Sequence, residues 1–292
     1  MDTRHMHYFM ALAETLHFGR AAKLLHMTQP PFSRQIALIE QKLGVKLFER
    51  NSRHVTLTPA GKHFLDDCRT VIAQFDAACR DVRLVASGMK GELRFGFMMH
   101  AAHSVVPRLV QRYSEIRPDV RLVLEERTPT EIDDMLMAGK LDAAVTFAPG
   151  YSPHLRTIHL AKEKLRMIMR ADHACANKRM IGPDDLCHER LIATPTSVAP
   201  TLRSAIASYF AAGGISPNFV LEPRLQHTII KLVAEGLGVA LIPESLCSML
   251  DESLVSKPLR TAPTLDVVLC APIASANPAV SALMDIAAQS SC

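Results

Sequence analysis

Basic side chains gathered in the first 65 positions are the residues of this chain best suited to bind a polyanion. That segment holds nine Lys and Arg residues against four acids, a net charge of +5, whereas the whole chain of 292 residues carries only +4. The remainder therefore carries a net charge of −1. A small basic segment on a nearly neutral body is typical of proteins that bind nucleic acid. The pattern predicts a nucleic-acid-binding module, with a merely solvated basic face as the alternative.

Polar residues that directly follow predicted strands form a second group able to do chemistry. Sheets of parallel strands bind ligands at the carboxyl ends of the strands. The segment 98–104 also opens a predicted helix, whose free backbone N–H groups could receive an anion. These segments offer no arginine that would fix a carboxylate. The predicted ligand-binding residues are His100, Ala101, Thr128, Thr146, Phe147, Thr194, Thr196, Ser197, Gln226 and His227.

Residue patterns typical of metal or covalent chemistry are weak in this sequence. His100 and His103 form an HxxH pair, but no third ligand follows at a suitable spacing, so we expect no metal. Motifs of nucleophilic or nucleotide-dependent enzymes, such as GxSxG, a Walker loop or GxGxxG, are absent. The seven cysteines contain no CxxC pair, which is typical of reduced thiols. We therefore expect no catalytic residues and no cofactor.

Three short helices within residues 1–58 must position the basic side chains. The third is the most informative, because Thr28 can cap it and two prolines follow in its first turn, where N–H groups have no helical partner. Its apolar residues step by three and four and define a buried face, which leaves a short, polar and cationic face for a DNA major groove. Gly44 ends this helix.

A predicted two-stranded hairpin follows, with alternating apolar and polar residues and the basic tip RNSR. Helices and hairpin in this order predict a winged helix-turn-helix. The predicted DNA-binding residues are Arg20, Thr28, Gln29, Pro30, Pro31, Ser33, Arg34, Arg50 and Arg53.

Residues 59–88 form a predicted linker helix with an apolar seam. The seam residues recur strictly at three and four, which a helix exposed to water alone would not tolerate. We expect a second copy to cover it, giving a homodimer; packing on the protein's own body is the alternative. The predicted dimerisation residues are Phe64, Cys68, Val71, Phe75, Ala78 and Val82.

Strands alternate with helices in residues 89–292, which predicts an α/β regulatory domain with a largely parallel sheet wound on both faces. Two such sets occur, and the final strand can return to the first. We expect lobe I at about 91–161 and 266–292, and lobe II at about 162–265. The fold class is therefore a multi-domain α/β protein with an N-terminal winged helix-turn-helix and a long linker helix.

The run RAAKLLHMTQPPFSRQIALIEQKLGVKLFER, at 20–50, resembles the DNA-binding head of LysR-type transcriptional regulators, and the resemblance covers essentially all of the first 61 residues. It departs at Gly19, where the family usually has Ser or Thr touching a phosphate. The resemblance implies dimers of dimers, joined through the linker helices. It also implies a two-lobed effector domain similar to periplasmic solute-binding proteins. The QPPFSRQI and ERNSR segments look like those of regulators of aromatic-acid catabolism, which favours a small carboxylate effector.

The expected function is that of a sequence-specific transcriptional regulator whose activity a small-molecule effector, such as a small organic or aromatic acid, modulates. Its expected partners are double-stranded operator DNA, the effector, RNA polymerase and further copies of itself, as a homodimer that assembles to a homotetramer. An α/β enzyme with a nucleic-acid-binding head, and an architectural DNA binder without an effector, are the alternatives. The longest apolar stretches are too short for a membrane span, and the N-terminus lacks signal-peptide features, so we expect a cytoplasmic protein.

Overall fold

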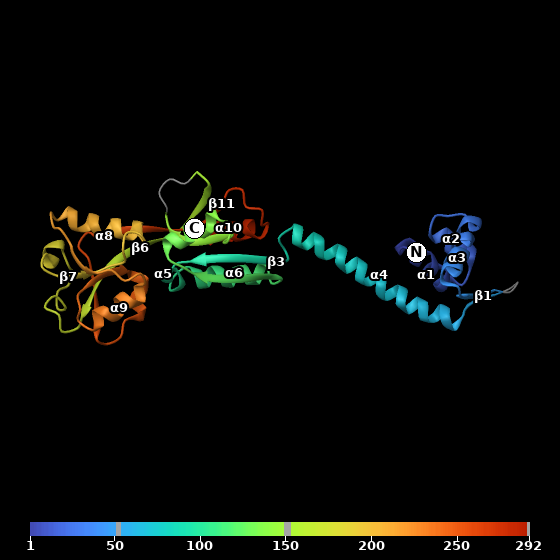
Figure 1. Ribbon diagram of the computed structural model, residues 1–292, viewed down its shortest axis with the longest axis horizontal. Coiled ribbons are helices and arrows are strands. Elements are labelled where there is room, and N and C mark those ends of the chain that lie inside the picture. The colour runs from blue at the N-terminus through green and yellow to red at the C-terminus, as the bar shows by residue number, and fades with distance from the viewer. Residues whose placement is uncertain (51–53, 149–152, 291–292) are drawn as a thin grey trace. The chain divides into compact units, whose positions relative to one another are not determined.

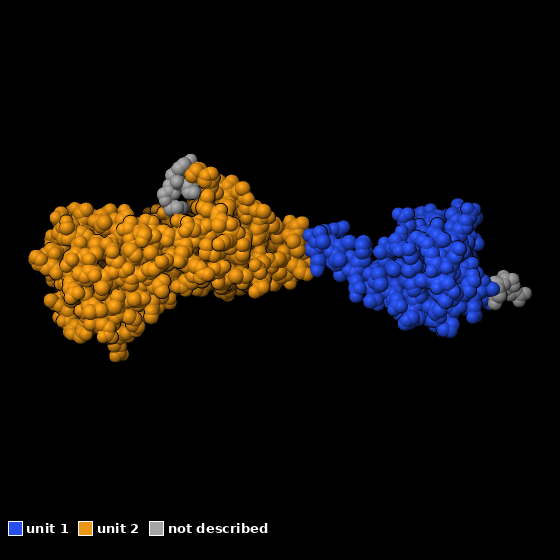
Figure 2. Space-filling view, in the orientation of Figure 1, with its two compact units in different colours: residues 1–83 blue, residues 84–292 orange. Residues whose placement is uncertain are grey.

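The computed structural model describes residues 1–50, 54–148 and 153–290, which fall into two compact units (Figure 2). The first unit is Met1–Arg83 and the second is Leu84–Cys292. Each has a hydrophobic core of its own. Among the described residues, no helix is both long and apolar enough to cross a membrane.

The first unit opens with three helices and a two-stranded hairpin. Their bounds are α1 Thr3–Thr15, α2 Phe18–Leu24, α3 Gln29–Leu43, β1 Phe48–Arg50 and β2 Val55–Leu57 (Figure 1). Thr28 occupies the N-cap position of α3, and Pro30 and Pro31 lie in its first turn, as predicted, but the Thr28 side chain makes no capping hydrogen bond. Gly44 ends α3 with a φ of 70°, a left-handed conformation that glycine adopts at little cost.

Apolar side chains from α1, α2 and α3 form the core of this unit. Phe9, Leu12, Phe32, Ile36 and Ile39 are all fully buried. Because the last three lie at spacings of four and three on α3, one face of that helix points into the core and the opposite face is left to solvent. The core therefore fixes which side chains of α3 can meet a ligand.

The linker helix α4 spans Pro59–Ala86, so at 1.5 Å per residue it is about 42 Å long. It begins against the hairpin: a Cβ added at Gly61 would lie 2.1 Å from the carbonyl oxygen of Leu47, so only glycine fits this approach. Gly88 follows the end of α4 with a φ of 68°, again a conformation that favours glycine.

The second unit alternates strands and helices, with two 3₁₀ helices (Figure 1). The elements are β3 Gly91–Phe97, α5 Met99–Ala102, α6 Val106–Ile116, β4 Val120–Glu126, α7 Pro129–Met137, β5 Ala143–Phe147, β6 Leu155–Arg170, η1 Pro183–Leu186, β7 Arg190–Ile192, α8 Pro200–Ala212, β8 Asn218–Leu221, α9 Gln226–Ala234, β9 Ala240–Pro243, η2 Glu244–Met249, β10 Leu254–Pro258, β11 Thr264–Pro272 and α10 Ala279–Ser290.

The main sheet is mixed, so the expectation of a largely parallel sheet was wrong. Its order is β10-β6-β11-β5-β3-β4, with β9 also paired to β6. Only the pairs β3/β4 and β3/β5 are parallel, whereas β11 is antiparallel to β5 and β6, and β9 and β10 are antiparallel to β6. The long strand β6 was not predicted. Its neighbours β9, β10 and β11 run antiparallel to it, and antiparallel strands can be joined without a helical crossover.

Strand β6 connects two lobes. The last strand, β11, pairs with β5 and with β6 from Leu155 onward, so the chain returns to the sheet of lobe I, as the sequence analysis expected. The second half of β6 pairs with β9 and β10 in lobe II, where β7 and β8 form a short parallel pair. The connections β3–α5, β4–α7 and β8–α9 therefore supply residues at the junction of the lobes.

Candidate functional site

One face of α3 presents the predicted DNA-binding side chains to solvent. Gln29, Pro30, Pro31 and Arg34 are exposed and Ser33 is half-buried. Thr28, at the N-cap of α3, and Arg20, on α2, are exposed as well. The structure thus brings seven of the nine predicted residues to the surface of the helix-turn-helix. A helix that presents a short, cationic, polar face has the shape and charge to enter a major groove.

The two remaining predicted residues, Arg50 and Arg53, differ in what the structure says of them. Arg53 lies outside the described residues. Arg50 already has two partners inside the head: its guanidinium donates to the Glu40 carboxylate at 3.2 Å and lies over the ring of Phe18, 4.8 Å from the centroid. The side chain of Arg50 therefore ties the hairpin to α2 and α3, a role that sequence reasoning missed.

Glu40 is the acceptor that holds the hairpin against α3. Its carboxylate is buried and accepts hydrogen bonds from the backbone N–H groups of Leu47 at 3.0 Å and Phe48 at 3.1 Å, and from the Lys46 ammonium at 3.1 Å. Burial by itself would raise the pKa of Glu40, but these hydrogen bonds outweigh it and the pKa lies below its usual value. The ionised carboxylate of Glu40 therefore fixes the start of β1 relative to α3.

The ring of His17 lies beside the position where this chain departs from the family pattern. His17 is the N-cap of α2, and its Nδ1 accepts from the backbone N–H of Arg20 at 3.3 Å. A Cβ built at Gly19 would lie 3.2 Å from His17 Cε1, which is a tight contact. The imidazole therefore takes up the space next to Gly19 and supplies a cap of its own.

An exposed apolar stripe runs along α4 from Val71 onward. Val71, Phe75 and Val82 are 40%, 52% and 70% exposed, and Ala78 is exposed too. The seam assignment needs a correction at its start: Cys68 is only 1% exposed within the core of the head, and the Phe64 ring packs 4.8 Å from that of Phe9. The first turns of α4 cover the head, so the free stripe begins after Cys68.

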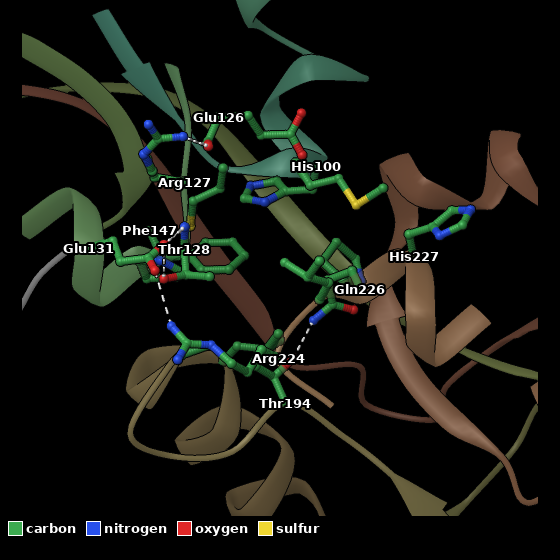
Figure 3. A pocket seen from close by; sticks show the side chains of 17 residues that line it. His100, Glu126, Arg127, Thr128, Glu131, Phe147, Thr194, Arg224, Gln226 and His227 are labelled. Carbon is green, nitrogen blue, oxygen red and sulfur yellow. Dashed lines mark hydrogen bonds and ion pairs between the residues drawn. The ribbon is translucent and has the colours of Figure 1, made fainter. Parts of the chain in front are cut away.

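A cavity of about 450 Å³ lies at the junction of the two lobes in the second unit (Figure 3). Its wall is largely apolar, with methionine, proline, leucine and phenylalanine side chains from both lobes. Its polar groups come from the ends of β4, β7 and β8 and from the first turns of α5, α7 and α9. The lining residues are Met98, Met99, His100, Glu126, Arg127, Thr128, Pro129, Glu131, Phe147, Thr194, Ala199, Leu202, Arg224, Leu225, Gln226, His227 and Pro243.

Six of the ten predicted ligand-binding residues line this cavity: His100, Thr128, Phe147, Thr194, Gln226 and His227. The other four, Ala101, Thr146, Thr196 and Ser197, are not among the lining residues. Ala101 lies fully in the hydrophobic core, and the buried hydroxyl of Thr146 faces Met98 Sδ at 3.7 Å. Thr196 and Ser197 are exposed, in a turn between Thr194 and the buried Val198.

Two arginines line the cavity, although the predicted ligand-binding segments themselves contain none. Arg127 comes directly after β4 and donates to the Glu125 carboxylate at 2.7 Å. Arg224 lies just before α9 and donates to the Glu131 carboxylate at 3.0 Å. Arg127 directly precedes Thr128 and Arg224 stands two residues before Gln226, so both arginines are close in sequence to predicted ligand-binding residues.

Thr128 and Glu131 form a capping box at the start of α7. Glu131 Oε2 accepts from the Thr128 backbone N–H at 3.0 Å and from the Thr128 hydroxyl at 2.7 Å. The Thr128 backbone hydrogen bond is the main cause that lowers the pKa of Glu131, so this carboxylate is ionised at neutral pH. The Thr128 hydroxyl is therefore committed to the helix cap.

Two buried polar atoms in the cavity wall lack a hydrogen-bond partner within the described part of the chain, His100 Nε2 and Gln226 Oε1. Burial lowers the pKa of His100 to about 3, so its imidazole is neutral. The Gln226 amide donates to the Thr194 hydroxyl at 2.8 Å, which orients it (Figure 3). Unsatisfied buried polar atoms are costly, and a ligand that hydrogen-bonds to them recovers that cost.

Both parts of the chain match known protein families. Residues 3–62 match the family described as bacterial regulatory helix-turn-helix protein, lysR family, and residues 86–291 match the LysR substrate binding domain. The chain is 33% identical to the HTH-type transcriptional regulator AlsR of Bacillus subtilis (strain 168), over 84% of this chain and 81% of that protein. It is 30% identical to the HTH-type transcriptional regulator BenM of Acinetobacter baylyi, over 85% and 82%.

Solved structures share the fold over the whole chain. Full-length CbnR complexed with its target DNA matches with a TM-score of 0.83 at 23% identity, covering 100% of both chains. Full-length BenM matches with a TM-score of 0.61 at 27% identity, covering 99% of this chain and 96% of that one. With the helix-turn-helix surface, the cavity between the lobes and relatives that are named as regulators rather than enzymes, the chain belongs to the LysR family of DNA-binding transcriptional regulators with an effector-binding domain.

Proposed function

We propose that this regulator binds its operator through α3 and responds to a small organic acid with a flat apolar body, bound in the cavity between the lobes. The observation that carries the proposal is the composition of that cavity. Arginine side chains lie in a wall that is otherwise largely apolar, together with the stacked rings of His100 and Phe147. Arginine donors match the geometry of a carboxylate, and apolar walls favour a hydrocarbon body.

The DNA contacts follow from exposure and position on the helix-turn-helix. Gln29, Pro30, Ser33 and Arg34, in the first turns of α3, face the bases, whereas Arg20 and the N-terminus of α3 at Thr28 face phosphates. Arginine and glutamine side chains can each pair with a base edge through two hydrogen bonds. Phosphate contacts fix the register of the head, and base contacts provide selectivity.

The assembly is a homodimer, paired through the exposed stripe of α4 and able to form a homotetramer, since an apolar stripe of this length requires a partner. The chain has three parts: a DNA-binding head at 1–58, a dimerisation linker at 59–88 and an effector-binding regulatory domain at 89–292. Within the regulatory domain, lobe II at about 162–265 is inserted into lobe I. Bound beside a promoter in the cytoplasm, such an assembly would act on RNA polymerase.

Selection of bound fragments from a random DNA library by the full-length protein tests the DNA half of the proposal. A recurring, two-fold related sequence is expected, since a symmetric dimer reads two half-sites. Thermal-shift measurements with a panel of small organic acids, followed by operator binding with each acid that raises the melting temperature, test the effector half. Binding without sequence selectivity, or an acid that is consumed during the assay, would contradict the proposal.

A further inference from the structure

An ion pair joins the two lobes at the cavity. Arg224, before α9 in lobe II, donates through one terminal nitrogen to Glu131 Oε1, on α7 in lobe I, at 3.0 Å (Figure 3). A second contact lies next to it: the Thr130 backbone N–H and hydroxyl both lie 3.3 Å from the Val198 carbonyl oxygen. The lobes are therefore held together here by α7, with the cavity beside it.

The two oxygens of Glu131 have separable functions. Oε2 accepts both hydrogen bonds from Thr128 and completes the cap of α7, whereas Oε1 faces Arg224. Breaking the ion pair would leave the cap in place. A glutamine at this position can also serve in a capping box, because its side-chain oxygen still accepts from the N-cap residue. The charge of Glu131 can therefore be removed without removing its structural contact.

The ion pair is weak enough to exchange. The side chains of Arg224 and Glu131 are 63% and 43% exposed, so solvent screens their attraction. Arginine carries five N–H donors and holds carboxylates best through two parallel hydrogen bonds. The other arginine of the cavity is less available: Arg127 donates to Glu125 at 2.7 Å and to the Glu126 carbonyl oxygen at 2.9 Å, both within its own segment.

We infer that Glu131 occupies on Arg224 the position that the carboxylate of the effector takes, so that an acid binds by displacing Glu131 and places its apolar body against the cavity wall. This rests on the proposed function and names the arginine that reads the acid. The exchange also removes one of the contacts between the lobes. An effector that replaces an inter-lobe ion pair binds the two lobe arrangements with different affinity, which is what a change in regulatory output requires.

Calorimetric titration of the full-length protein with benzoate and with benzamide, its uncharged counterpart, tests this inference. Glu131→Gln is expected to bind benzoate about three- to ten-fold more tightly than the wild type, since no carboxylate competes for Arg224. Benzamide binding should not change. Glu125→Gln is the matched control: it releases Arg127 instead and should leave benzoate affinity as in the wild type. Arg224→Gln should abolish the gain when it is combined with Glu131→Gln.

Three results would overturn the inference: no benzoate binding to Glu131→Gln, an equal gain in Glu125→Gln, or benzoate affinity that survives Arg224→Gln. Unfolding curves of each variant confirm that it is folded, and the retained capping box predicts a native melting temperature for Glu131→Gln. Failure of the proposed function has a different signature. Benzoate would then bind Glu131→Gln more tightly, yet no acid in the panel would alter operator binding.

Discussion

The imidazole of His100 lies flat on the phenyl ring of Phe147, with ring centroids 4.4 Å apart and planes inclined by 10°. His100 follows β3 and Phe147 ends the neighbouring strand β5, and both side chains are almost fully buried in the cavity wall. Burial of the imidazole, to which this stacked ring contributes, removes it from water and lowers the pKa of His100 to about 3. A neutral His100 can donate or accept a hydrogen bond without charge at the surface of the cavity.

Acid should destabilise this protein through His100. Its pKa is about 3 in the folded state, against the ordinary histidine value of 6.5 that holds in the unfolded chain, so below pH 6.5 the unfolded chain binds more protons at this site. The stabilising effect of a neutral His100 is fully present above pH 6.5 and is lost as the pH falls toward 3. When the pH is lowered from about 7.5 to about 5, the imidazole of His100 should cost the wild type about 2 kcal/mol of unfolding free energy. The His100→Phe variant should not show this loss.

Denaturant titrations at the two pH values check this expectation. His103→Gln is the matched variant, because His103 lies three residues further on but is exposed. If His100→Phe loses stability with acid as steeply as the wild type, the imidazole is not held neutral by burial.

Thr128→Val should weaken α7 rather than remove a free ligand contact. The valine keeps the volume but deletes the hydroxyl that donates to Glu131 Oε2 at 2.7 Å. Loss of an N-terminal capping interaction costs about 1 kcal/mol of unfolding free energy, while Thr128→Ser should retain most of it. Thermal unfolding of both variants measures the difference. Equal melting temperatures for the valine and serine variants would show that the Thr128 hydroxyl contributes nothing to the cap.

Arg34→Ala should cost about 1 to 3 kcal/mol of binding free energy at the selected operator and relax discrimination at one base pair, if Arg34 pairs with a base edge. Lys42→Ala, in the last turn of the same helix, is the control, since its charge lies away from the first turns of α3. Fluorescence anisotropy with operator and mutated operators at fixed salt measures both. Uniform weakening across all sequences would identify Arg34 as a phosphate contact instead.

Phe75→Asp should dissociate the dimer. Phe75 is 52% exposed on the apolar stripe of α4, and a carboxylate buried in an interface without a partner costs several kcal/mol, so it should split the pair. Ala73→Asp is the control, because Ala73 is also exposed but lies on the opposite face of the helix. Sedimentation velocity reports the mass. A native mass for Phe75→Asp would exclude the stripe as the dimer contact.

Local patterns in the sequence were sufficient for the head and for the outline of the body. The prolines after Thr28, the glycine at position 44 and the apolar spacing from Phe32 to Ile39 are local signals, so the sequence alone determined α3 and its exposed face. Strand ends are local too, which is why His100, Thr128 and Gln226 were correctly placed in the cavity wall.

Contacts between distant segments required the tertiary structure. Cys68 continues the seam of α4 by spacing, yet it is buried because the first turns of that helix fold back on α1 and the hairpin. Glu131 and Arg224 stand 93 positions apart and meet only because β6 and β11 bring the two lobes together. Periodicity specifies which face of an element is apolar, whereas the pairing of charges depends on which elements the sheet places side by side.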